Sequence, residues 1–305
     1  MRKSTARRNK VTTIDLSDFE RPGRGRGFVD VFRRRYLLSL LVRKGTSTRY
    51  RNSVLGWTWS YVKPLIQFFI YYAVMGFIFG LDRGLNNYPL YLFSGFIMVS
   101  FFNEAFGNAT TAVVDNKALV KKIYLPRELF PISAIIGAFI HFLPQVAILL
   151  IVALSYGWVP SLSHIGAAIL GLVIVGLTAL GLGLFFAGMN VRYRDAGNFV
   201  DVLRQLATWA SPVLYTWKLI DENLDSWVLT VYMMNPITIA VELFHYAFWE
   251  PTVEPFATGT NEGGWFGFAP HFDLYTIGSV ILALLFVVIG QLTFRRFERT
   301  FAQDL

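Results

Sequence analysis

The sequence has few of the residue groups that carry out enzymatic chemistry. It contains no G-x-x-x-x-G-K-[ST] sequence, hence no P-loop for ATP, and no H-E-x-x-H sequence. The chain has no cysteine, which excludes thiolate metal sites, and its four histidines are scattered along the sequence. We therefore expect neither a metal nor a cofactor on this chain. A membrane-embedded sugar transferase would need clustered external acids, whereas the first expected external loop offers only Asp82. Catalysis is therefore unsupported.

Basic and aromatic residues gather instead in short segments. The first is RYRNSVLGWTW (Arg49–Trp59), followed by Lys63-Pro64-Leu65, and the second is NKALVKKIYLPR (Asn116–Arg127). The third is Arg192-Tyr193-Arg194-Asp195, with Ser211-Pro212-Val213-Leu214-Tyr215 further along, and the chain closes with FERTFAQDL (Phe297–Leu305).

Two polar residues, Asn103 and Glu104, lie within an apolar run. An acid within a membrane span usually faces a wet cavity or a partner. If Glu104 instead lies near the outer interface of the membrane, it needs no special role. The sequence does not decide between these two locations of Glu104.

The elements that must position these residues are membrane spans. Of 305 residues, 54% are apolar and 16% charged, against about 25% charged in a soluble domain. A span needs about 20 apolar residues, and residues 129–191 contain no Asp, Glu, Lys or Arg. We therefore expect an all-α integral membrane protein with six spans: Leu65–Leu81, Tyr88–Val114, Leu129–Tyr156, His164–Met189, Asn198–Leu219 and Leu274–Phe294. The fifth is the weakest, because Asp201 and Arg204 lie near its start.

The basic residues predict the orientation. Of the 28 Lys and Arg residues, 26 lie in alternate segments on one side of the six spans and two on the other. The positive-inside rule places the 26 in the cytoplasm, together with both termini. The net charge of +8 is therefore explained by topology and is not a signal for nucleic acid.

The amino-terminal region divides into two parts. Residues 1–27 are basic, polar and Gly-rich and are predicted to be a mostly disordered cytoplasmic tail. They contain no apolar h-region, so they are not a cleaved signal peptide. Residues 28–44 place apolar residues near helical spacing beside arginines, which predicts a helix on the anionic inner leaflet. A basic stretch without fixed structure is the alternative.

Residues 219–273, between spans five and six, are expected to be external. Trp227–Met234 and Ile237–Phe248 are apolar, but each is too short to cross, and Asn235-Pro236 separates them. They predict a re-entrant hairpin or a pair of interfacial helices, because backbone at membrane depth must be covered by protein. An ordinary external loop with two amphipathic helices is the alternative. Pro251–Asp273 is predicted to be an external insertion.

Together these motifs resemble the membrane subunit of ABC exporters for lipid-linked polysaccharides, the ABC-2 type family of Wzm-like permeases that includes teichoic-acid, O-antigen and cell-wall galactan exporters. The resemblance covers roughly residues 28–305; the long basic tail and the Pro251–Asp273 insertion depart from the family pattern. It implies a multi-pass protein of the bacterial inner membrane that forms a homodimer. It also implies a separate ATPase subunit that binds ATP and Mg, and an external gate within residues 219–273.

The resemblance also implies roles for particular residues. The loop before Pro126 would contain a coupling helix that docks on the ATPase, formed by Asn116, Lys117, Leu119, Val120, Lys121, Lys122 and Tyr124. A plain positive loop that anchors topology is the alternative.

The expected cargo is a glycan on a polyprenyl diphosphate, which the cations Arg49, Arg51 and Lys63 would meet at the cytoplasmic interface. These cations could instead be topology anchors that snorkel. Residues expected to line the channel are Gln67, Tyr71, Tyr72, Asn103, Glu104, Trp209, Tyr215 and Trp217.

Two other functions stay open from the sequence. One is an ABC exporter of a drug or small lipid. The other is a membrane glycosyltransferase or scaffold without transport.

Overall fold

The computed structural model describes residues 31, 33–49, 53–81, 85–122, 125–193, 195–253 and 267–304. The predicted tail at residues 1–27, Arg51, Tyr124 and residues 254–266 of the predicted insertion lie outside the described residues, as does the side chain of Arg49.

Within these ranges the chain is helical and forms no β-strand, which confirms the predicted fold class. The helices are α2 (Arg35–Arg49), η2 (Gly56–Thr58), α3 (Trp59–Tyr71), η3 (Tyr72–Ile78), α4 (Tyr88–Asp115), α5 (Lys117–Lys122), α6 (Leu129–Ser155), α7 (Leu162–Arg192), α8 (Ala196–Trp209), α9 (Trp217–Asn223), α10 (Ser226–Met233), α11 (Pro236–Phe244), η5 (His245–Trp249), η6 (Glu250–Thr252), α12 (Phe272–Glu298) and α13 (Phe301–Asp304).

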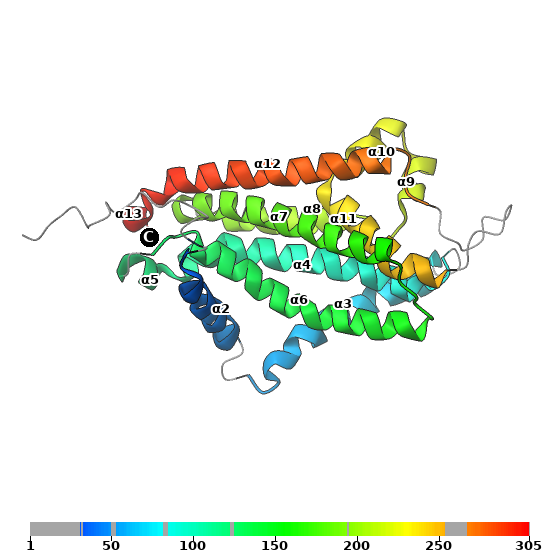
Figure 1. Ribbon diagram of the computed structural model, residues 1–305, viewed down its shortest axis with the longest axis horizontal. Coiled ribbons are helices and arrows are strands. Elements are labelled where there is room, and N and C mark those ends of the chain that lie inside the picture. The colour runs from blue at the N-terminus through cyan, green and yellow to red at the C-terminus, as the bar shows by residue number, and fades with distance from the viewer. Residues whose placement is uncertain are drawn as a thin grey trace, which may run out of the picture.

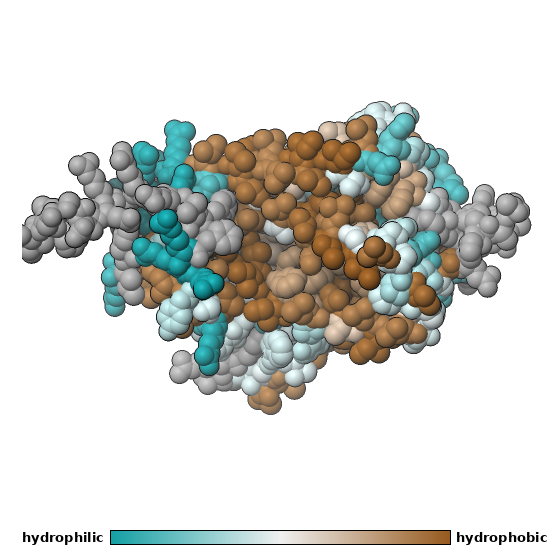
Figure 2. All heavy atoms as spheres, viewed as in Figure 1, coloured by the Kyte–Doolittle hydropathy of each residue, from teal (hydrophilic) through white to brown (hydrophobic). Residues whose placement is uncertain are grey.

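Five helical segments in the described chain are long and apolar enough to cross a membrane: Gly56–Ile78, Tyr88–Asp115, Leu129–Ser155, Leu162–Arg192 and Phe272–Glu298. A sixth candidate is the pair Ser226–Met233 and Pro236–Thr252, which is bent by 81°. On the face shown in Figure 2, apolar side chains cover the middle of the molecule, and more hydrophilic ones lie toward both ends. The fold is that of an integral membrane protein.

The predicted fifth span, Asn198–Leu219, is not one helix. Helix α8 ends at Trp209 after 14 residues, or about 21 Å at 1.5 Å per residue, which is short of the ~30 Å hydrocarbon layer. Non-helical residues follow as far as Thr216. Pro212 accounts for the break, because it has no N–H to donate and its ring clashes with a helical carbonyl four residues earlier.

Helix α4 forms the centre of the bundle, with 78% of its apolar window buried. It packs against α6, α7 and α8, and aromatic side chains such as Phe102 and Phe106 fill the space around it. On the outside, α7 and α12 approach each other closely at Gly181 and Gly290. A Cβ on Gly290 would collide with the Gly181 carbonyl, so small residues set this spacing.

Two groups of short helices lie at opposite ends of the bundle (Figure 1). Helices α5 and α13 lie at one end, here called the α5 end, which the positive-inside rule assigns to the cytoplasm. Helices α9 and α10 lie at the other, here called the α10 end. The helix predicted within residues 28–44 is present as α2, but it runs on to Arg49. It packs against α6 at an incline to the bundle.

The apolar pair after α8 forms a bent hairpin. All nine residues of α11 are buried, and α11 packs against α4 and α7. This burial favours the re-entrant interpretation over an ordinary external loop, since the backbone of α11 is covered by protein. By contrast, Trp227 and Val231 of α10 are 65% and 61% exposed.

Candidate functional site

A polar cavity of about 430 Å³ lies between α3, α4 and α8. It brings together four of the residues predicted from the sequence, Lys63, Gln67, Asn103 and Glu104. Further polar residues that line it are Ser60, Ser100, Asn108, Arg204 and Thr208, and the rings of Trp59 and Phe96 also contribute. The cavity therefore collects charges and amides between otherwise apolar helices.

The cavity lies beside the first turns of α3 but away from the α5 end of α4 and α8. Asn108 precedes the end of α4 at Asp115 by seven residues, or about 10 Å along the axis. Arg204 follows the start of α8 at Ala196 by eight residues, or about 12 Å. Ionisable residues that lie within membrane helices usually face a wet cavity or a partner.

Helices α4 and α8 are tied together at the cavity wall. Asn103 Nδ2 donates a 3.0 Å hydrogen bond to Thr208 Oγ1, which donates to the Arg204 carbonyl at 3.1 Å. Asn103 Oδ1 is buried, and in the described part of the chain nothing donates to it. Because this oxygen is itself buried, a hydroxyl or amine of a bound molecule could reach it only after the cavity wall opens.

Arg204 is the site residue that the sequence reasoning missed. It was noted only as a weakness of the fifth span, although an arginine within an apolar segment is itself a signal for a functional position. In the structure its guanidinium contacts Gly107 on α4, so it is part of the cavity wall.

The start of α3 is pinned to α6 by a buried histidine. His141 Nδ1 lies 3.1 Å from Trp57 Nε1 and 3.1 Å from Ser60 Oγ, and the histidine is 3% exposed. Because an indole N–H can only donate, Nδ1 accepts this bond. The contact holds the first turn of α3 beside the polar cavity.

The other predicted lining residues lie outside this cavity. Tyr71 meets Phe96 edge-on at 5.9 Å, and Tyr72 stacks on Tyr88 at 6.2 Å. Trp209, at the end of α8, is 50% exposed, and Trp217 Nε1 donates to the Gly267 carbonyl at 3.3 Å.

Tyr215 lies in the non-helical segment after α8. Its hydroxyl donates to the Trp209 carbonyl at 2.5 Å, and burial raises the pKa of its phenol. With Leu81 and Leu214 it lines a smaller cavity of about 170 Å³. The end of η3 and the segment after α8 are therefore neighbours beyond the polar cavity, toward the α10 end.

Helix α5 has one buried and one exposed side. Val120 is 7% exposed and belongs to an apolar cluster with Phe130 and Phe301, against which Leu119 also packs. The exposed side presents Lys117, Lys121 and Lys122. A short helix anchored by apolar residues and basic on its outer side is suited to contact with another protein.

Two connections fix α5 to the rest of the α5 end. Lys44 Nζ of α2 donates a 2.8 Å hydrogen bond to Oδ1 of Asn116, whose Nδ2 donates to the Ala112 carbonyl at 2.8 Å. On the other side Arg127 donates to the Glu298 carbonyl and lies 5.5 Å from the centre of the Phe301 ring. These bonds join the residue before α5 to α2, and the segment before α6 to the end of α12.

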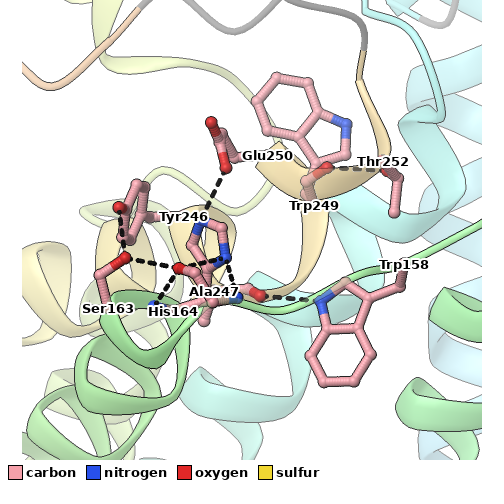
Figure 3. Close-up of polar contacts among 9 residues, drawn as sticks. Trp158, Ser163, His164, Tyr246, Ala247, Trp249, Glu250 and Thr252 are labelled. Atoms are coloured by element: carbon pink, nitrogen blue, oxygen red, sulfur yellow. Dashed lines mark hydrogen bonds and ion pairs between the residues drawn. The ribbon is translucent and has the colours of Figure 1, made fainter.

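The carboxyl end of the hairpin is fastened to the α6–α7 turn (Figure 3). His164 Nε2 lies 2.9 Å from Glu250 Oε2, while its Nδ1 accepts a 2.9 Å bond from the Ser161 backbone N–H. Nearby, Trp158 Nε1 donates to the Ala247 carbonyl at 2.9 Å, and the Tyr246 hydroxyl donates to Ser163 at 3.2 Å. These contacts, here called the latch, fix residues 246–250.

The chain is similar to one family and to a group of permeases. The family described as "ABC-2 type transporter" matches residues 36–249. An O-antigen export system permease protein RfbA of Klebsiella pneumoniae is 31% identical over 206 residues, which cover 66% of this chain and 77% of that protein. The RfbA permease protein of Myxococcus xanthus is 27% identical over 230 residues, which cover 74% and 86%.

Proposed function

Because the chain belongs to the ABC-2 type transporter family, we propose that it is the membrane subunit of an ATP-driven exporter of a polysaccharide linked to a polyprenyl diphosphate. The cargo moves from the cytoplasm across the inner membrane. ATP is bound and hydrolysed by a separate subunit that docks on α5.

The polar cavity between α3, α4 and α8 is the observation that carries this proposal. Membrane helices place charges and amides inward only where water, a partner or a substrate meets them. Two cations in its lining, Lys63 and Arg204, suit phosphate, and its amides with Trp59 suit sugar hydroxyls and ring faces.

The weak packing of the first span supports a homodimer. Only 6% of the apolar window of Gly56–Ile78 is buried, against 78% in α4. Large side chains along it, including Phe69 and Phe77, are 61% and 67% exposed. In the dimer, α3 and α8 of the two copies would face each other, and the polar cavities would open into a shared channel.

The contacts of α5 supply a route for coupling. Nucleotide binding in the partner displaces α5, and the Lys44–Asn116 bond carries that displacement to α2. Trp57 and His141 hold the start of α3, and ring contacts hold its other end to α4. Because most of this span is otherwise exposed, α3 can then move away from α8 and open the channel.

The hairpin at the α10 end acts as the external gate. Residues 246–250 are held by the latch, and Trp249 Nε1 donates to the Asn86 carbonyl at 2.7 Å. Helix α10 precedes the 81° bend and is exposed. It is the part of the hairpin that moves.

Co-purification tests the proposal against its rivals. The tagged chain, extracted from its native membrane in mild detergent, should bring down a P-loop ATPase in about equal amount, with vanadate-sensitive ATP hydrolysis. Recovery of the chain alone, under conditions that preserve other membrane complexes, would support a glycosyltransferase or scaffold. Stimulation of the ATPase by drugs or phospholipids but not by lipid-linked glycans would support the small-molecule alternative.

A further inference from the structure

Arg204 has an incomplete set of partners for a guanidinium in its position. Its Nη1 lies 2.9 Å from Asp201 Oδ1, one turn earlier on α8, but 69% of the Asp201 side chain is exposed. Ion pairs to solvated carboxylates contribute little. Arg204 Nε is buried and has no acceptor in the described part of the chain. A buried donor without an acceptor is costly, unless a bound molecule supplies one.

Gly107 allows the guanidinium to occupy this position. A Cβ at residue 107 would lie 2.9 Å from Arg204 Nη1, 3.0 Å from Cζ and 3.2 Å from Nε. The guanidinium therefore lies directly against the backbone of α4. Any larger residue at 107 would push it away from this position.

The cavity carries a second cation on its α3 side. Lys63 lines the same cavity, and its Nζ lies 5.9 Å from the centre of the Trp59 ring. Of the acidic residues, only Glu104 is in the lining that the structure describes. Two carboxylates balance these two cations: Glu104 in the lining and the exposed Asp201, which pairs with Arg204. An anion bound between the cations would therefore replace the Asp201 carboxylate at Arg204.

We propose that Arg204 and Lys63 bind the phosphate groups of a glycosyl diphosphate lipid, and that Gly107 is required to seat Arg204. This site rests on the proposed function and specifies where its cargo is recognised. An arginine binds two phosphate oxygens at once and a lysine acts as a point charge. Asn103 Oδ1, which is buried and lacks a donor among the described residues, would accept a hydrogen bond from a hydroxyl of the first sugar when α3 moves and opens the cavity wall. A phospholipid presents the same phosphate chemistry without the sugar.

Native mass spectrometry of the purified permease–ATPase complex tests this assignment. Each variant is titrated with a synthetic polyprenyl diphosphate sugar and, separately, with phosphatidylglycerol. We expect Arg204→Gln and Gly107→Ala to weaken binding of the diphosphate sugar by about tenfold or more, as loss of a charged hydrogen bond implies. Arg204→Lys should weaken it less. Phosphatidylglycerol occupancy should not change.

Two controls separate the site from general charge effects. Arg296→Gln removes an exposed cation at the α5 end of α12 and should leave binding unchanged. Asp201→Asn removes the competing carboxylate and should leave binding unchanged or tighten it.

Three outcomes would overturn the assignment. Equal binding of the diphosphate sugar by wild type, Arg204→Gln and Gly107→Ala would remove Arg204 from the site while leaving the exporter function intact. If Arg204→Gln and Gly107→Ala lost binding of phosphatidylglycerol but kept binding of the diphosphate sugar, the cavity would be a phospholipid site. A wild-type complex that binds no polyprenyl diphosphate sugar at all would overturn the cargo class as well.

Discussion

Lys44 of α2 and Asn116, the residue before α5, are joined by a 2.8 Å hydrogen bond between Nζ and Oδ1, although 72 residues separate them in the chain. Asn116 also donates to the Ala112 carbonyl in the last turn of α4. This one side chain therefore connects the inclined helix, the central helix and the expected ATPase contact.

Asn116→Ala tests whether this connection carries the coupling. The substitution removes both side-chain hydrogen bonds, so ATP hydrolysis should continue while glycan export falls several-fold. The measurement is the ratio of glycan exported to ATP hydrolysed in vesicles that contain both subunits. Lys44→Met, which removes only the bond to α2, should give a smaller loss in the same direction. An unchanged ratio in both variants would exclude this route.

The basic side of α5 is predicted to contact the ATPase. Exchanging Lys121 and Lys122, both exposed, for Glu should abolish co-purification or stimulation of the ATPase while membrane insertion persists. The double exchange to Arg keeps the charge and should retain both activities. Normal export by the Glu variant would contradict the coupling assignment.

The proposed gate predicts that the latch holds residues 246–250 in place while α10 moves. The chain has no cysteine, so His164→Cys with Glu250→Cys can be bridged by a bis-alkylating reagent long enough to replace the two side chains that now meet at 2.9 Å. Export should survive this bridge.

A matched bridge between Tyr215→Cys and Tyr232→Cys, whose native rings lie 6.3 Å apart, would tie α10 to the segment after α8. It should block export while ATP hydrolysis continues. If the bridge between residues 164 and 250 blocked export and the bridge between residues 215 and 232 did not, the latch would be the contact that moves.

The close approach of α7 and α12 predicts a stability difference between two glycines of α12. Gly290→Ala places a methyl group against the Gly181 backbone and should cost about 1–3 kcal/mol through overpacking. Gly278 has nothing within 4 Å of a Cβ, so Gly278→Ala should be neutral. The thermal unfolding midpoint of each variant in the same detergent measures the difference, and equal midpoints would show that the helices can separate without cost.

The sequence predicted those parts of the fold in which long apolar runs dominate. The spans at α6, α7 and α12 could be located because their charge-free runs are long enough to cross the hydrocarbon layer, and the span at α4 because Glu104 is the one charged residue in Tyr88–Val114. The fifth span could not, because hydropathy does not register the break that Pro212 introduces into an apolar segment. The orientation stays a prediction from the charge distribution.

The site was predicted only in part. Lys63 was chosen as a cation for the lipid diphosphate, and Gln67, Asn103 and Glu104 as polar residues within the spans that could line the channel. All four share one cavity. Arg204 was treated as an interruption, since nothing in the sequence places it against Gly107 on α4. Contacts of that kind depend on how α8 packs across α4, and local sequence patterns do not encode them.

The most direct test of the central claim is transport itself. Inside-out vesicles that contain this chain and its ATPase are loaded from outside with a polyprenyl diphosphate glycan, and the fraction of glycan protected from an added glycosidase is measured over time. We predict protection that requires ATP, stops with vanadate and is lost when Lys121 and Lys122 are exchanged for Glu. Protection that is the same with and without ATP, or none at all in vesicles whose ATPase is active, would contradict the proposed function.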